Sequence, residues 1–159
     1  EYGNYLLMPF PTKIYGLYGY SAFNGDVDLI LYSDPLGTPV AEKTVSIDLN
    51  QVGNTGPRAW QVIFSAPYTT TASQPLAAII KPTSATNISA PYRIFSAAAH
   101  QITEHCGTNG YAVNRASGAF AAQNSNKDRF GLGVLVGAWD NGAGGGSAGM
   151  LFIPDLSGT

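Results

Sequence analysis

The sequence predicts an all-β protein, an antiparallel β-sandwich of the jelly-roll type, on three observations. Apolar and polar residues alternate over short segments, which is the pattern of strands with one buried face. Turns rich in glycine and proline separate these segments at intervals of roughly 8–12 residues, as in sandwiches and jelly rolls. No long segment carries apolar residues at the helical period of about 3.6.

The segment from Asp26 to Leu49 is the clearest element, and we expect it to be a β-hairpin. In its first half, apolar residues occupy every second position: Val27, Leu29 and Leu31. Asp34-Pro35-Leu36-Gly37 then interrupts the pattern with turn residues, because proline presets φ and glycine relieves a strained position. The alternation resumes from Val40 onward. Two antiparallel strands joined by this turn form the frame of the predicted sandwich.

Further strands are expected along the rest of the chain. They are Lys13–Phe23, with bends or bulges at its glycines, and then Trp60–Phe64, Leu76–Lys81, Tyr92–Ala97 and Phe130–Trp139. The last of these should be central in its sheet, because both of its faces are small or apolar. The run from Tyr5 to Phe10 should be an edge strand or a segment that leads into the first strand, because its proline has no N–H to donate to a ladder of hydrogen bonds. Residues 101–106 and 111–123 stay open between strand and loop.

Composition predicts the domain organisation. Residues 1–140 contain the expected strands and make up the sandwich domain. Residues 141–149, with the sequence NGAGGGSAG, are of low complexity and are typical of a flexible, Gly-rich linker. Residues 150–159 are then a C-terminal tail or the start of a next module.

The composition also limits the classes of partner. The chain has 159 residues, of which 45% are hydrophobic, enough for one domain with a core. Only 11% are charged, against about 25% on average, which suits a protein that packs against copies of itself or works outside cells. The net charge of −2 supplies no field for nucleic acid, and no apolar run approaches the roughly 20 residues that span a bilayer. The single cysteine excludes an intrachain disulfide.

Three segments, in this order, resemble a widespread β-jelly-roll module: LYSDPLGTPVAEKTV, WQVIFSAPYT and LAAIIKPT. Phe120 and Asp128-Arg129-Phe130 resemble its closing strands. The resemblance covers residues 14–139 and departs at Thr70–Gln74, where these modules usually have a Gly-containing turn. Such modules look like carbohydrate-binding modules. They occur in extracellular proteins and in bacteriophage virion proteins such as tail appendages and head fibres.

The resemblance implies a role without catalysis. We expect a structural or assembly domain of a surface structure, most simply a bacteriophage virion protein, that acts by packing against other virion subunits or copies of itself. The alternative is a carbohydrate-binding module of a longer extracellular enzyme or adhesin, with a glycan as partner. Either implies a location in the virion or outside cells. No nucleic acid, membrane or cofactor is expected to be bound.

Two groups of residues are candidates for these roles. Sugars stack on exposed aromatic rings, and Tyr18 and Tyr20 lie on the same side of an expected strand, so both are candidate ligand-binding residues. The alternative is that the tyrosines are half-buried with only the hydroxyl outward. For subunit packing, the candidate interface is the apolar run in the tail: Met150, Leu151, Phe152 and Ile153.

The sequence gives weaker support for metal binding and for catalysis. In the segment His100–Cys106, three potential ligands would share one face of a strand, but they lack the paired spacing of a structural zinc site. Asp26, Asp28 and Asp34 could hold Ca²⁺, although roles in turns or on the solvent face explain them as well. No acid, base and nucleophile converge in the sequence, and we therefore expect no enzyme.

Overall fold

The computed structural model describes residues 1–8, 11–21, 25–48, 58–84, 93–96, 111–122 and 128–136. These residues form strands and turns, and none of them belongs to a helix that could cross a membrane. The strands are β1 (Tyr2–Met8), β2 (Lys13–Ser21), β3 (Asp26–Ser33), β4 (Val40–Asp48), β5 (Arg58–Thr69), β6 (Gln74–Pro82), β7 (Arg93–Ser96), β8 (Tyr111–Asn114), β9 (Ala121–Ala122), β10 (Asp128–Phe130) and β11 (Leu132–Val136).

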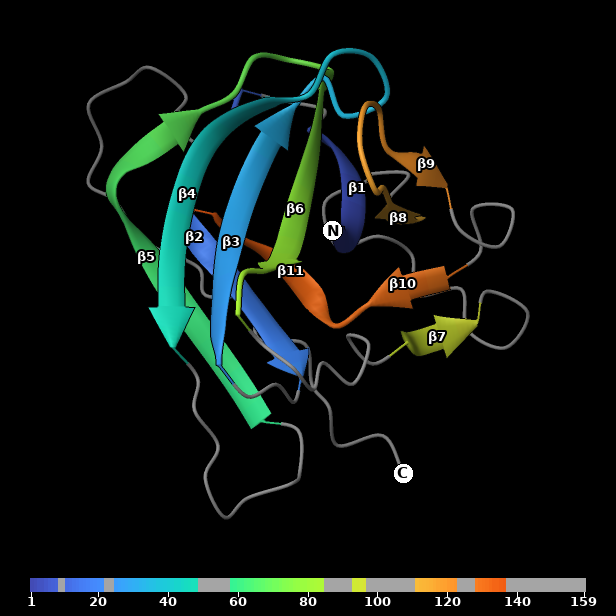
Figure 1. Ribbon diagram of the computed structural model, residues 1–159. Helices are drawn as coiled ribbons and strands as arrows, with labels where there is room; N and C mark the ends of the chain where they lie inside the picture. The colour runs from blue at the N-terminus through green and yellow to red at the C-terminus, as the bar shows by residue number, and fades with distance from the viewer. Residues whose placement is uncertain are drawn as a thin grey trace.

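Two antiparallel sheets pack face to face, which confirms the predicted β-sandwich (Figure 1). The large sheet has six strands in the order β4-β3-β6-β1-β8-β9, and the small sheet has three in the order β11-β2-β5. A separate pair joins β10 to β7. The chain passes from one sheet to the other between β1 and β2, β2 and β3, β4 and β5, and β5 and β6. The predicted hairpin, β3–β4, stays within the large sheet.

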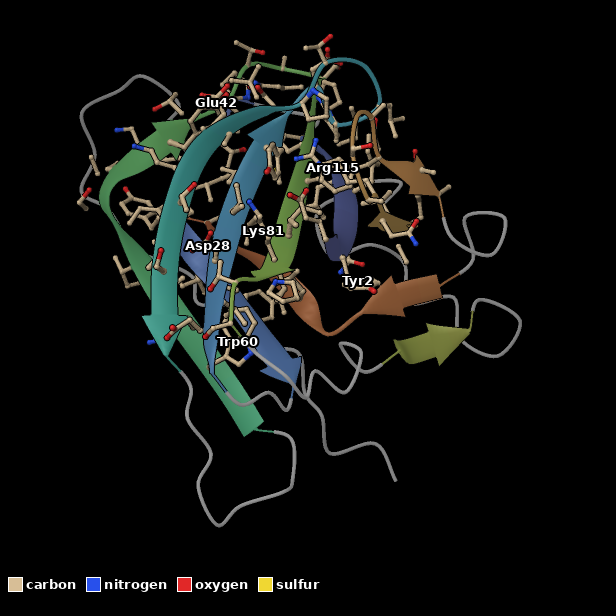
Figure 2. The ribbon with its side chains drawn as sticks, viewed as in Figure 1. Tyr2, Asp28, Glu42, Trp60, Lys81 and Arg115 are labelled. Atoms are coloured by element: carbon tan, nitrogen blue, oxygen red, sulfur yellow. The ribbon has the colours of Figure 1, made fainter. Side chains whose placement is uncertain are left out.

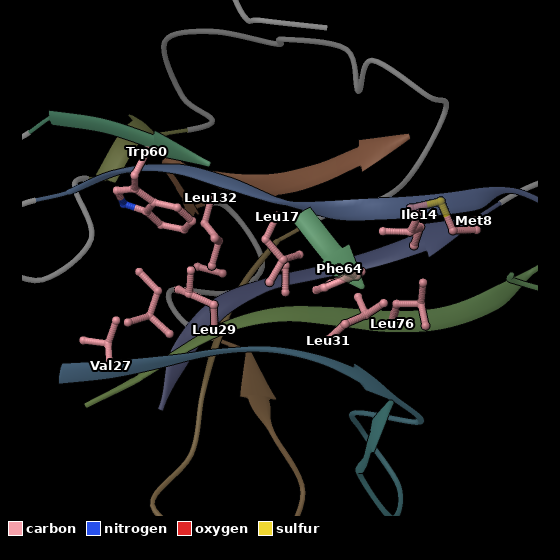
Figure 3. Packing of buried hydrophobic residues seen from close by; sticks show 13 residues of the cluster. Met8, Ile14, Leu17, Val27, Leu29, Leu31, Trp60, Phe64, Leu76 and Leu132 are labelled. Atoms are coloured by element: carbon pink, nitrogen blue, oxygen red, sulfur yellow. The ribbon is translucent and has the colours of Figure 1, made fainter. Parts of the chain in front are cut away.

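The main core lies between the two sheets (Figure 3). The large sheet contributes the apolar positions that the alternation predicted: Val27, Leu29 and Leu31 of β3, and Leu76, Ala78 and Ile80 of β6. The small sheet contributes Leu17, Trp60, Phe64 and Leu132 from the opposite side. Gly19 pairs directly with Trp60, and a Cβ on this glycine would lie 2.2 Å from the indole ring. The missing side chain of Gly19 therefore makes room for the indole.

One polar side chain crosses this core. Asn4 of β1 is only 4% exposed, and its Nδ2 donates a hydrogen bond of 2.6 Å to the carbonyl oxygen of Leu132 in β11. The bond joins the two sheets directly. Because a buried amide is costly without a partner, Asn4 favours one relative placement of the sheets over others.

The large sheet also buries its other face. A second apolar group, called here the outer cluster, lies on the side away from the small sheet: Ile30, Tyr32, Ala77, Ile79, Val113 and Phe120. Strand β6 has all of its residues from Leu76 to Ile80 buried, because odd and even positions face different clusters. This accounts for its continuous apolar sequence, which is typical of a strand covered on both faces.

Two predictions about strand position are wrong. The first strand is not at an edge, because β1 lies between β6 and β8. The strand ends at Met8, so Pro9 and Pro11 come after it in the sequence and remove no N–H donor from its ladder of hydrogen bonds. The expected strand Phe130–Trp139 is divided at Gly131 into β10 and β11, which pair with different partners, and β11 is the last strand of the small sheet among the described strands.

The hairpin turn has the predicted place but a different physical basis. The residue with left-handed backbone is Asp34, at φ 46°, and not Gly37. The Asp34 carboxylate accepts a 2.8 Å hydrogen bond from the Thr38 amide, which holds the turn closed. Gly37 is needed because a Cβ there would lie 2.5 Å from that carboxylate. Glycine thus serves close approach at this turn, and the strain falls on the aspartate.

Candidate interaction surface

Two strands, β4 and β5, form one side of the sandwich. Among the strands that the structure describes, each ends the strand order of its own sheet, β4 in the large sheet and β5 in the small one. They lie next to each other on the left of Figure 1. An edge strand carries backbone N–H and C=O groups that no neighbouring strand satisfies, and natural proteins usually protect such edges with charges, bulges or short length.

The edge of β4 has that protection. Lys43 lies opposite Leu31, so its side chain is on the face of β4 that borders the core, where an inward charge hinders pairing with a further strand. Glu42 is the extra residue of a β-bulge, and its carboxylate accepts a 2.5 Å hydrogen bond from Ser33 Oγ. Val40, the first residue of β4, is exposed. The inward Lys43 and the bulge at Glu42 therefore both disfavour the pairing of another strand with β4.

The edge of β5 lacks charges but has a bulge: between Ile63, opposite Gly16, and Tyr68, opposite Ile14, four residues of β5 lie against one residue of β2. No charged residue occurs from Ala59 to Thr69, and the strand is the longest that the structure describes. Ile63, near its middle, is 60% exposed. Pro67, which has no N–H to donate, lies within this bulge. By contrast, β11, the strand at the other edge of the small sheet among the described strands, is short. Its Leu132 carbonyl already accepts a hydrogen bond from Asn4.

The outer face of the small sheet carries the predicted tyrosine site. Tyr18 of β2 lies opposite Gln61 on one side and Gly133 on the other. Its half-buried ring lies over Gly133, where a Cβ would be 2.7 Å from the ring. The register places Tyr20 opposite Ala59, two residues along from Tyr18 and on the same face of the strand, as predicted; its side chain lies outside the described part of the structure.

The outer face of the large sheet is closed by residues 115–120, the segment between β8 and β9 (Figure 2). The Arg115 guanidinium carbon lies 4.6 Å from the centre of the Tyr32 ring and 4.3 Å from that of Phe120. Arg115 also pairs with Glu1 through Nε and donates a 2.7 Å hydrogen bond from Nη1 to the Gly118 carbonyl. The Phe120 amide donates to the Pro35 carbonyl at 2.8 Å, which attaches the segment to the β3–β4 turn.

Burial on this face changes the acidity of its tyrosines. The rings of Tyr5 and Tyr111 stack with centres 4.6 Å apart, and burial raises the pKa of both phenols. Burial also raises the pKa of Tyr32. The Glu1 carboxylate raises it further, and Arg115 opposes the change. The face is therefore covered around the outer cluster, whereas Thr44 and Ser46 of β4, on the same side of the sheet, are exposed.

The structure does not bring the proposed calcium ligands together. Asp26 accepts a hydrogen bond from Ser84 Oγ, Asp28 accepts one from Ser46 Oγ, and Asp34 caps its own turn. Across the ranges that the structure covers, no three His, Cys, Asp or Glu side chains are grouped as a metal site would require. The Ca²⁺ hypothesis at these three aspartates is therefore wrong, and their roles are the turn and surface roles that the sequence also allowed.

Several predictions fall on residues outside the described ranges. They are the linker 141–149, the candidate interface Met150–Ile153 and the potential ligands in His100–Cys106. All of these stay predictions.

Sequence reasoning missed the β5 edge and the role of Arg115. The sequence does contain one signal for this edge. The segment from 59 to 69 has no charged residue, and apolar residues outnumber polar ones at its centre. What the sequence could not show is that β5 ends a sheet. Arg115 gave no signal, because its partners Glu1 and Tyr32 are far away along the chain.

Comparison of the chain with protein-family models, with curated proteins and with solved structures found no match. The geometry of the described residues is therefore the basis for a functional proposal.

Proposed function

We propose that this chain is a non-catalytic assembly domain of a surface structure, of the kind that builds bacteriophage virions, and that it acts by packing against further subunits. The observation that carries the proposal is the contrast between the two adjacent edges. Both strands contain a bulge, but β4 also carries Lys43 and Glu42, whereas β5 has no charged residue from Ala59 to Thr69 and exposes 60% of Ile63. An uncharged edge with an exposed apolar side chain is the part of this side that is better suited to contact another subunit.

Two further observations support a structural role. Apolar clusters lie on both faces of the large sheet, so two packed layers hold its strands together. The charged fraction of 11% leaves much of the surface neutral, which lowers the electrostatic cost of packing subunits side by side. The assignment to a virion, as opposed to another surface assembly, draws on the resemblance to jelly-roll modules.

Sedimentation velocity over a concentration series tests the assembly role. We expect the mean sedimentation coefficient to rise with protein concentration. A single monomeric species up to the solubility limit would contradict the proposal. For the virion assignment, the genes that flank the coding sequence provide a test, because a neighbouring or fused hydrolase in place of structural genes would argue against it.

A carbohydrate-binding module is the second candidate, and Tyr18 is the observation in its favour. An aromatic ring on a sheet face, with the Gln61 amide on the neighbouring strand, supplies the stacking surface and the polar group that a sugar requires. A glycan array tests this. Binding by the native chain that Tyr18→Ala abolishes would support it, with Tyr2→Ala, on the large sheet, as control. If the native chain binds no glycan, this candidate is eliminated.

A further inference from the structure

We propose that the side of the sandwich formed by β4 and β5 opens locally as a unit, and that a chain of hydrogen-bonding side chains from four strands keeps it shut. These side chains are Ser33, Glu42, Tyr68 and Gln74, and we call them the latch. The inference concerns the two strands whether or not another subunit contacts them, so it does not rest on the proposed assembly role.

The strands β4 and β5 are weakly attached where the latch lies. Among the described strands, β4 pairs only with β3 and β5 only with β2. Each of these ladders contains a bulge, at Glu42 in β4 and at residues 64–67 in β5. A bulge interrupts the regular ladder of hydrogen bonds. The start of β4 and the end of β5, both in the upper part of Figure 1, are therefore held by few ladder bonds.

The latch crosses from one sheet to the other at the two bulges. Glu42 Oε1 accepts a 2.5 Å hydrogen bond from Ser33 Oγ of β3, which fixes the carboxylate beside β5 (Figure 2). The phenol of Tyr68 in β5 faces this carboxylate. Burial raises the pKa of Tyr68, the Gln74 amide opposes the change, and Glu42 raises it further by its charge and by hydrogen bonding. The extra residue of one bulge thus meets the residue that ends the other.

The turn between β5 and β6 completes the latch. Gln74 Nε2 donates a 2.7 Å hydrogen bond to the Tyr68 hydroxyl oxygen, and Gln74 Oε1 accepts a 2.8 Å hydrogen bond from the Thr71 amide. The Gln74 amide group is therefore held at both ends. Because the phenol oxygen accepts from Gln74, its own hydrogen is the one directed to Glu42. A connected set of this kind is worth more than its separate bonds.

The latch covers one end of the main core. Tyr68 packs against this core and lies opposite the buried Ile14 of β2. Phe64, in the bulge of β5, is only 6% exposed. Segments that few ladder bonds hold open at a lower free energy than the whole domain unfolds. We therefore expect the β4–β5 side to open, and to expose Phe64 and Ile14, before the interior strands β1 and β6 separate.

Native-state hydrogen exchange, resolved by residue with NMR, tests the latch. Ser33→Ala, Glu42→Gln and Tyr68→Phe should each raise the exchange rate of the hydrogen-bonded amides in residues 40–43 and 64–69. The expected rise is about two- to tenfold, which corresponds to the loss of one hydrogen bond. Exchange in β1 and β6 should keep the native rate.

Ser46→Ala is the matched control. It removes a hydrogen bond of the same kind, 2.6 Å from a serine hydroxyl to the Asp28 carboxylate, between the same two strands but away from both bulges. Exchange in residues 40–43 and 64–69 should be unchanged in this variant. A rise equal to that of Ser33→Ala would mean that any contact between β3 and β4 has the same effect, and would overturn the inference.

A double variant tests whether the two sides of the latch act together. Glu42→Gln combined with Tyr68→Phe should raise exchange by about as much as the larger of the two single effects, because either change already breaks the same chain. If the double variant instead shows the product of the two single effects, the two residues act independently and there is no latch.

The distribution of the changes decides the outcome. A rise confined to residues 40–43 and 64–69 supports the latch. A rise of equal size in β1 and β6 would mean that the latch residues only add to global stability, and would overturn it, as would unchanged exchange in all three variants. If Tyr68→Phe does not fold, Ser33→Ala and Glu42→Gln decide between these outcomes. Sedimentation of the native chain tests the assembly role separately, so one proposal can fail while the other stands.

Discussion

The guanidinium carbon of Arg115 lies 4.6 Å from the centre of the Tyr32 ring, on the face of the large sheet that points away from the core. These two residues connect a loop near the end of the chain to a strand near its beginning. The contact closes the outer cluster, because the same guanidinium reaches the Phe120 ring and the Glu1 carboxylate. The Arg115 side chain thus helps to hold residues 115–120 against the sheet, together with the hydrogen bond from the Phe120 amide to the Pro35 carbonyl.

Replacing Arg115 should therefore destabilise the fold more than replacing its neighbour Lys81. Arg115→Met keeps the apolar volume but removes two cation–π contacts and a partly buried ion pair, for an expected loss of about 1–3 kcal/mol. Lys81 lies 4.0 Å from the same Glu1 carboxylate but is 45% exposed, so Lys81→Met should cost no more than about 0.5 kcal/mol. Urea unfolding measures both. Equal losses would show that the aromatic contacts contribute nothing.

Removing the hydrogen bond between the sheets should also be costly. Asn4→Ala deletes the donor to the Leu132 carbonyl and leaves that buried oxygen without this bond, for an expected loss of about 1–3 kcal/mol in the free energy of unfolding. Gln61→Ala, an exposed amide on β5, is the control and should change stability by less than about 0.5 kcal/mol. The idea that Asn4 joins the sheets fails if the two variants unfold at the same urea concentration.

A methyl group at Gly19 should displace the Trp60 indole. Because the added Cβ would lie 2.2 Å from the ring, Gly19→Ala should destabilise the protein by about 1–3 kcal/mol and shift the tryptophan fluorescence. The smaller side chain of Trp60→Leu should remove that conflict. In a double-mutant cycle, the two substitutions together should therefore cost less than the sum of the single ones. If the two losses of stability were additive, the destabilisation by Gly19→Ala would not come from a clash with Trp60.

Two substitutions of Asp34 in the hairpin turn separate the effect of its hydrogen bond from that of its backbone strain. Asp34→Ala keeps a Cβ at φ 46° and loses the hydrogen bond to the Thr38 amide, whereas Asp34→Gly loses the bond but relieves the backbone. Asp34→Gly should therefore be the more stable of the two by about 1 kcal/mol. Thermal unfolding measures the difference. If the alanine variant were the more stable, the backbone at this position would not be strained.

Alkaline pH should weaken the fold through its buried tyrosines. Burial raises the pKa of Tyr5, Tyr32 and Tyr111 above the value of about 10 that phenols have in an unfolded chain. Between these two pKa values the unfolded chain has released the proton and the folded one has not, so stability falls as the pH rises above about 10. Urea unfolding from pH 8 upward should show this decline. The double variant Tyr5→Phe/Tyr111→Phe should show a shallower one; an unchanged slope would contradict the assignment.

Much of the fold was predictable because it depends on local sequence. The alternation in β3 identifies the side chains that enter the core, and the turn at Asp34–Gly37 specifies the hairpin. The side on which Tyr18 and Tyr20 lie follows from the period of a strand. These features were determined by residues close together in the chain, where the period of a strand leaves few choices.

What the tertiary structure alone decided is which strand lies beside which. That β1 lies inside the large sheet, that β5 ends the small one, and that Arg115 meets Tyr32 all depend on pairings between residues far apart along the chain. A strand with an uncharged sequence reads the same whether it is central or at an edge. Whether Ile63 is a buried residue or an exposed contact therefore depends on the neighbours that the fold places around β5, and no local pattern records them.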